Sequence, residues 1–285
     1  MFRLLATVIL LGTLVLFGCR QQQEPPTARV VASEAYRSYF GEPPTVAEGV
    51  CYALVGFYPL ADDPTQFRPV PHFTFATQGR PQMLLQQVMF GPEAFGMDDF
   101  LINPFPENAS LREVSVSDGL ATAYFSPELM QVRSDLQQAM LAAIGHTLLQ
   151  FEEIERVQVM VGGQIPPLFP EGDISLQGTE VVDPGPPVLL QALLHEDSDA
   201  IPGEMLVFFD RPVEVRSFVM EFPQGEAVQG DYFTSVFDMA VVVHPADPGR
   251  IRPGDEVYLS WNIVDGKGRE SWGDGLWPLA LLSHD

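Results

Sequence analysis

Histidines are the first residues to examine for chemistry in this 285-residue chain. None of the five stands in a zinc-protease helix motif or in a paired spacing that would chelate zinc. The sequence also contains no nucleophile elbow, phosphate-binding loop or dinucleotide fingerprint. We therefore expect solvated or capping histidines, no catalytic residue, no metal ligand, no cofactor and no enzymatic activity. The histidines are His72, His146, His195, His244 and His284.

Two clusters keep a ligand-binding alternative open. Residues 195–199 (His-Glu-Asp-Ser-Asp) group carboxylates that could hold a hard cation such as calcium, but they lack the glycine and terminal glutamate of an EF loop. A solvated turn is the favoured interpretation. Trp261, Trp272 and Trp277, with Tyr258, could form a sugar-stacking platform. Packing in a core or at a strand edge is favoured for these aromatic residues.

The N-terminus predicts membrane attachment through lipid. One positive charge, on Arg3, precedes the apolar run 4–17, which has the length of a signal-peptide core and is shorter than the roughly 20 residues of a spanning helix. The run ends in Leu16-Phe17-Gly18-Cys19, which resembles the bacterial lipobox. The resemblance implies a signal peptide over residues 1–18 and acylation of Cys19. An ordinary secretory signal cut elsewhere, or an uncleaved anchor, is the alternative.

The segment after the signal and the second cysteine complete this picture. Residues 19–47 begin polar and proline-bearing, which predicts a flexible tether. Cys51 is the only other cysteine, so a lipidated Cys19 leaves no disulfide within the chain. We expect Cys51 to be a small buried hydrophobe rather than a reactive thiol.

Charge excludes one class of partner. The formal net charge is −23 and the pI is near 4.3, with 38 acidic against 15 basic residues. A chain of this charge cannot gain binding energy by neutralising phosphates, so nucleic acid is not an expected partner. Anionic lipid headgroups would repel it, and attachment must come from the N-terminal lipid.

The central stretch, residues 111–163, predicts a strand, a tight turn, a strand, a long helix and a strand. Asp118-Gly119 lies between alternating β-formers, the strongest short-range hairpin signal. Ser126-Pro127-Glu128 starts helical structure, and the longer helix is expected from about Ser134. One helix face is apolar, with Leu136, Met140, Ala143, Ile144, Thr147, Leu148 and Phe151; the other carries Arg133, Asp135, Gln137, Gln138 and Gln150, with His146 also placed on the polar side.

Upstream, two strands are expected at about 51–58 and 67–75, followed by a proline-led helix at 81–90. The resulting order is ββαββαβ. The sequence therefore predicts an α+β domain over residues 48–164, with two helices on one face of a mixed sheet.

This region resembles the GerM-type domain of sporulation and spore-germination lipoproteins. The resemblance covers about residues 50–164 and implies a similar fold and an assembly role, related to the ring-building motifs of secretion machines. Gly162 stands where an aspartate is common in that family. The matching positions are Leu84-Leu85, Gly91-Pro92, Gly96, Pro104, Pro106, Phe125, Ser126, Glu128, Thr147-Leu148, Phe151 and the closing strand Val157, Val159 and Val161.

The remaining chain has a different composition. Residues 165–187 are rich in proline and glycine and predict a linker, or a strap over the first domain. Residues 188–285 contain seven short apolar runs between turn signals, which favour an all-β immunoglobulin-like sandwich. Residues 208–213 (Phe-Phe-Asp-Arg-Pro-Val) look like a strand of bacterial surface modules of that type. The seven runs are 188–194, 205–209, 213–222, 232–236, 239–243, 257–264 and 276–282.

The sequence as a whole predicts a non-catalytic, lipid-anchored protein on the extracytoplasmic face of the cell membrane. Its surfaces are expected to bind other envelope proteins, as the GerM-type resemblance implies, and homo-oligomers could form. The main alternative is a ligand-binding lipoprotein that recognises peptidoglycan, glycan or a cation such as calcium. A hydrolase assembled from dispersed residues is the third.

Overall fold

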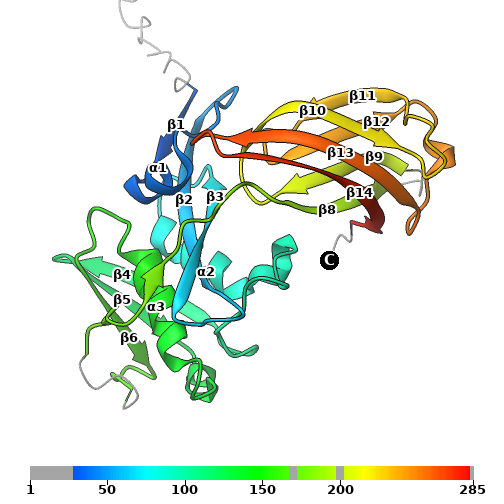
Figure 1. The fold of residues 1–285 in the computed structure, drawn as a ribbon. Helices are drawn as coiled ribbons and strands as arrows, with labels where there is room; N and C mark the ends of the chain where they lie inside the picture. The colour runs from blue at the N-terminus through cyan, green and yellow to red at the C-terminus, as the bar shows by residue number, and fades with distance from the viewer. Residues whose placement is uncertain (1–27, 167–171, 197–201, 283–285) are drawn as a thin grey trace, which may run out of the picture.

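The computed structural model describes residues 28–166, 172–196 and 202–282. Two separate hydrophobic cores divide these residues into an N-terminal unit and a C-terminal unit, which stand side by side (Figure 1). Within the described ranges, no helix is long and apolar enough to cross a membrane.

The N-terminal unit is α+β. Its elements are β1 (Arg29–Ala32), α1 (Glu34–Phe40), β2 (Val50–Pro59), β3 (Gln66–Thr74), α2 (Arg80–Phe90), η1 (Pro92–Phe95), β4 (Leu111–Ser117), β5 (Leu120–Phe125), η2 (Pro127–Gln131), α3 (Gln137–Leu148), β6 (Arg156–Val161) and β7 (Glu180–Val181). Its core is built from β2, α2, α3 and the inner face of β5 and β6.

The strands form two sheets, so the prediction of one mixed sheet is wrong. One sheet has the order β1-β2-β3-β7 and the other β4-β5-β6. Both α2 and α3 contact β2, and α2 also contacts β4. The sheets stay apart because β1 occupies the outer edge of β2, while Pro69 and Pro71 deprive the far edge of β3 of N–H donors.

The range 19–47, predicted to be a tether, contains β1 and α1. Ser33 caps α1 by accepting a hydrogen bond from the Tyr36 backbone N–H. Tyr36 and Phe40, one helical turn apart, are buried in the core, and β1 pairs in parallel with β2. The polar and proline-bearing composition did not predict α1, although the serine cap and the aromatic spacing were signals of a short helix.

The predicted hairpin is confirmed. Asp118 and Gly119 both have positive φ, 51° and 76°, as a two-residue type I′ turn requires. The helix α3 begins at Gln137 and is buried around more of its circumference than predicted, because Ala139, Ala142 and Gly145 are buried in addition to the predicted face. The strap described next covers part of the side expected to be polar, where the Thr179 hydroxyl lies 3.1 Å from Nε2 of His146.

Residues 172–182 form a strap and not a free linker. The Ile174 N–H donates to the Val157 carbonyl at 2.7 Å, and β7 pairs in parallel with β3. A Cβ on Gly145 of α3 would lie 2.8 Å from Leu176, so the glycine lets the strap lie close against the helix. This part of the segment belongs structurally to the N-terminal unit.

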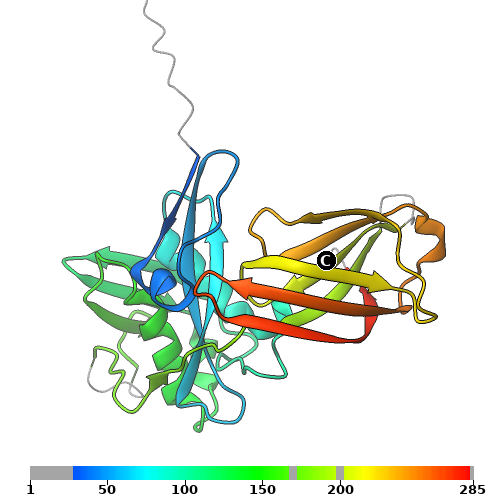
Figure 2. The ribbon, with the colours of Figure 1, turned by 45° about the horizontal axis from the view of Figure 1, so that its top comes forward.

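The C-terminal unit is all β apart from one short 3-10 helix, η3 (Pro248–Arg250). Each of the seven predicted apolar runs overlaps one strand: β8 (Leu189–Glu196), β9 (Pro202–Phe209), β10 (Val213–Glu221), β11 (Gly230–Thr234), β12 (Ala240–Pro245), β13 (Glu256–Asp265) and β14 (Glu270–Leu281). The order is β10-β13-β14-β8-β9-β12-β11. β14 pairs with β13 through Pro278 and then with β8 from Leu279, so the sheet folds over. Figures 1 and 2 show the two groups of strands as facing layers around the second core.

Candidate functional site: the junction between the two units

The junction is organised by one buried arginine. Arg211 lies in the turn between β9 and β10 and is 1% exposed. Its guanidinium donates to Asp210 at 2.7 Å and to Asp265 at 3.2 Å. It also donates to the backbone carbonyls of Pro184 and Gly185. A buried guanidinium with this many partners is desolvated but fully hydrogen-bonded, which is the condition for a buried charge to be tolerated.

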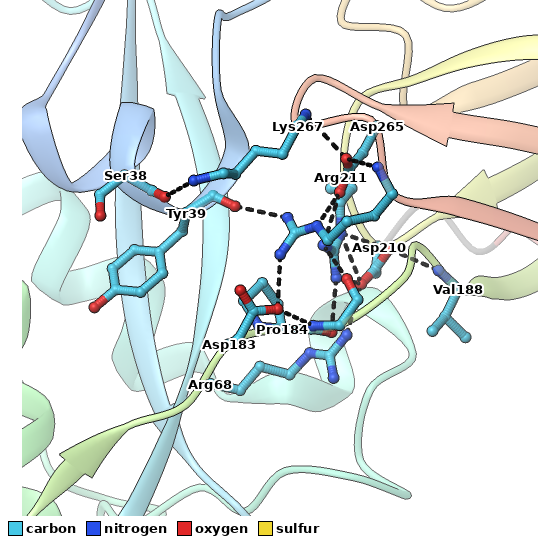
Figure 3. A network of polar contacts seen from close by, with 12 residues as sticks. Ser38, Tyr39, Arg68, Asp183, Pro184, Val188, Asp210, Arg211, Asp265 and Lys267 are labelled. Carbon is cyan, nitrogen blue, oxygen red and sulfur yellow. Dashed lines mark hydrogen bonds and ion pairs between the residues drawn. The ribbon is translucent and has the colours of Figure 1, made fainter.

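Two further arginines tie this centre to the N-terminal unit (Figure 3). Arg68 of β3 reaches Asp210 at 2.8 Å. Arg269, in the turn between β13 and β14, donates to Asp265 at 2.7 Å, to Asp183 at 2.8 Å and to the Tyr39 carbonyl at 2.6 Å. The hydrogen bond from the Gly185 backbone N–H, with Arg269 nearby, lowers the pKa of Asp183.

Backbone contact accompanies the ion pairs. Lys267 Nζ donates to the Ser38 carbonyl at 2.7 Å, as Figure 3 shows. A Cβ on Gly266 would lie 2.5 Å from the Phe40 carbonyl oxygen, and one on Gly41 would lie 2.5 Å from the Gly266 oxygen. Only glycine fits at such an approach, so the end of α1 is seated directly on the β13–β14 turn.

An apolar cleft of about 510 Å3 lies beside the polar network, and Asp210 borders both. The N-terminal unit contributes β3 and η1 to the cleft; the C-terminal unit contributes β8, β9, the turn after β11 and Leu282. Phe237 lines the cleft and stacks on Phe73, with ring centroids 4.5 Å apart. The two units are therefore joined by this apolar stack as well as by the ion pairs.

The histidines separate into two environments, and the prediction of solvated or capping roles is wrong for two of them. His72 is half-buried where it lines the cleft, 3.2 Å from the Tyr58 hydroxyl, and burial lowers its pKa to about 4. His146 lies between the rings of Phe57 and Phe67, and burial lowers its pKa to about 4 as well. Both are packing residues that stay neutral near pH 7.

His195 and His244 flank one carboxylate on the outside of the C-terminal unit. They lie 3.4 Å and 3.2 Å from Glu204, in one row across β8, β9 and β12. In the part of the chain that the structure describes, no group of three or more His, Cys, Asp or Glu side chains could hold a metal ion. Residues 197–199 of the acidic run, Cys19 and His284 lie outside the described residues.

The other sequence candidates are placed as follows. Cys51 is buried, as predicted, and burial raises the pKa of its thiol. Trp261 and Trp277 meet edge-on at 6.2 Å against the second core, where Gly273 leaves room for the indole of Trp261. Trp272 is 78% exposed and stands apart from them. The three tryptophans therefore do not form a common platform.

Sequence reasoning missed the junction residues. Ser38 and Tyr39 lie in the range predicted to be a tether, and Asp183 lies in the predicted linker. The available signal was Asp210-Arg211 in residues 208–213: a charged pair between apolar strands needs partners when it is buried. Its partners lie between 22 and 142 residues away along the chain, so the sequence could not name them.

The fold and the junction together define a two-unit protein, in which an α+β unit is fixed to an all-β unit by a buried polar junction. Residues 57–165 match the family model Germane, described as sporulation and spore germination. The GerM-type resemblance is thereby confirmed for this part of the chain. No curated protein matches the chain.

Two solved structures from Bacillus subtilis are similar to the chain. The tandem GerMN domains of the sporulation protein GerM are 17% identical, with a TM-score of 0.34, over 55% of this chain and 59% of theirs. The first GerMN domain of the same protein is 19% identical, with a TM-score of 0.33, over 46% of this chain and 95% of its own. The chain thus spans little more than half of the tandem-domain structure. These similarities are weak, and the family assignment of residues 57–165 depends on the family model.

Proposed function

We propose that this protein is a non-catalytic, lipid-anchored envelope protein with a role in sporulation or germination, working as an interaction module. The observation that carries the proposal is the family-model match over residues 57–165. The lipobox-like Leu16-Phe17-Gly18-Cys19 supports attachment to the extracytoplasmic face of the membrane. The C-terminal unit is proposed to be an immunoglobulin-like sandwich, because β8-β9-β12-β11 and β10-β13-β14 reproduce the two sheets of that fold in strand order.

The three-stranded sheet offers a surface for a protein partner. Its inner residues, such as Ala121, Ala123 and Val157, are buried against the helices. On the opposite face Thr122, Tyr124 and Met160 are half-buried at the surface. A sheet with one packed face and one accessible face can present such residues to another protein without unfolding.

Site-specific photocrosslinking in cells tests this surface. A photoreactive residue at Tyr124 should capture one or a few defined envelope proteins, while the same residue at the exposed Gln138 of α3 should not. Equal capture from both positions, or capture of no defined protein from Tyr124, would contradict the proposal.

Fractionation of Cys19→Ser tests the anchor: the variant should leave the membrane or keep its signal uncut.

The alternative of a ligand-binding lipoprotein is favoured by one observation, the cleft between the units. Its lining is apolar, which does not suit a glycan or calcium, since both require several polar ligands. A different ligand chemistry follows from that lining.

A further inference from the structure

The cleft has the size and position of a small-molecule site. Its volume, about 510 Å3, lies within the roughly 300–1,000 Å3 of typical ligand pockets, which often occur between domains. Buried side chains, including Val70, Met97 and Phe209, form the interior. Val236, 68% exposed, and Ala94 lie at the solvent side. The cleft is therefore open to a ligand from outside and apolar within.

The polar groups along the cleft are engaged or uncharged. Asp210 accepts hydrogen bonds from Arg68, Arg211 and the Val188 N–H. The Ser235 hydroxyl oxygen accepts from the backbone N–H groups of Met239 and Ala240. Burial keeps His72 neutral. Gln191 adds a neutral amide to the wall.

An ionised ligand would lose its hydration here without gaining a counter-ion, because the charge of Asp210 is already balanced by two arginines. A hydrocarbon chain would instead replace water along apolar walls. β3 forms its hydrogen bonds to β7 through odd-numbered residues, and the next two odd-numbered residues on that edge are Pro69 and Pro71. Because proline has no backbone N–H, an extended peptide is disfavoured as an added strand beside β3.

We propose that the cleft binds an uncharged ligand made mostly of hydrocarbon, such as the acyl chain of a neutral lipid, with the Gln191 amide meeting its polar group. The site lies on a different surface from the sheet face proposed for protein partners. Either inference can therefore fail without the other.

Photolabelling of the full-length protein in membranes tests the site. The probe is a monoacylglycerol with a diazirine in its acyl chain, and labelled peptides are mapped after digestion. We expect labels on the segments that contain Met97, Leu193 and Phe237, which come from both units. A photoreactive peptide that is N-acylated serves as a second probe, since an acyl chain attached to a protein has the same chemistry as a free lipid. Labelling by either probe supports the site and indicates the source of the chain.

Variants make the test specific. Val236→Asp and Ala94→Asp place a charge at the mouth and should reduce labelling at least about tenfold. Val219→Asp is the matched control, because Val219 is also an exposed valine of the C-terminal unit, 44% exposed, and does not line the cleft. Circular dichroism confirms that each variant is folded, and crosslinking from Tyr124 should be unchanged in all three.

Four results would overturn the inference. The first is labelling of Val236→Asp at the wild-type level. The second is labelling spread over exposed apolar residues such as Trp272 and Phe90. The third is equal labelling by the same photoreactive chain ending in a carboxylate. The fourth is labelling by the same peptide without its acyl chain.

Discussion

At the residue scale, the two buried histidines make stability depend on pH. The pKa of His72 is about 4 in the folded chain, against an ordinary value of 6.5, because burial disfavours the charged ring. Between these values the unfolded chain binds a proton that the folded chain does not. The contribution of neutral His72 to the free energy of unfolding is therefore fully present above pH 6.5, and it is lost as the pH falls toward 4.

We expect the urea midpoint of the wild-type protein to fall over this interval. His72→Asn should flatten the pH dependence, although not completely, because His146 shifts in the same direction. His244→Asn is the control, since His244 is 53% exposed. The urea midpoints of the His72 and His244 variants could change with pH at the same rate between pH 4 and 6.5. In that case burial of His72 does not govern the pH dependence of stability.

At the element scale, the strength of local signals explains what could be predicted. Asp118-Gly119 fixes its hairpin through two positive φ values, a requirement that short-range sequence expresses directly. The seven strands of the C-terminal unit were likewise predicted by apolar runs between turns. The split into two sheets was not, because it depends on β1 pairing with β2 and on which edge of β3 carries prolines.

The interior of the N-terminal unit shows the same limit. The spacing of apolar residues predicted the buried face of α3, yet Gln150 was expected to be solvated. Its amide instead accepts from the Val55 N–H at 3.0 Å and donates to the Val55 carbonyl at 2.6 Å. A polar side chain just past the end of a helix can form hydrogen bonds with a neighbouring strand. Periodicity cannot distinguish such a side chain from one that faces water.

Substitutions in α3 test directly which side of the helix is buried. Ile144→Asp should unfold the N-terminal unit, because it places a charge at a fully buried position and costs several kcal/mol. Gln138→Asp should have a small effect, since Gln138 is exposed and loses only its bond to the Gln177 carbonyl. Thermal unfolding followed by circular dichroism compares the two. Equal tolerance of both substitutions would mean that the helix faces the other way.

At the scale of the whole molecule, the junction should make the two units unfold together. Arg269 is bonded to Asp265 in its own unit and to Asp183 and Tyr39 from the other part of the chain. Arg269→Ala should therefore separate one calorimetric transition into two. Arg250→Ala is the matched control, because it removes an exposed pair with Glu226 and a contact with the Phe222 ring, both within the C-terminal unit. Two transitions already present in the wild-type protein would show that the junction does not couple the units.

The same junction changes what cleavage of the chain between the units should do. A cut within residues 165–187 would leave the Arg68–Asp210 ion pair between the two pieces, along with the close contact between Gly41 and Gly266. We therefore expect the two pieces made by limited proteolysis to elute as one species in size-exclusion chromatography under native conditions. Arg211→Ala should release them, because it leaves the buried carboxylates of Asp210 and Asp265 with one arginine partner each instead of two. Breaking a buried ion pair by removing one partner costs about 3–5 kcal/mol. Pieces that separate in the wild-type protein would instead indicate that the chain connection alone holds the units together, which is the behaviour of a free linker.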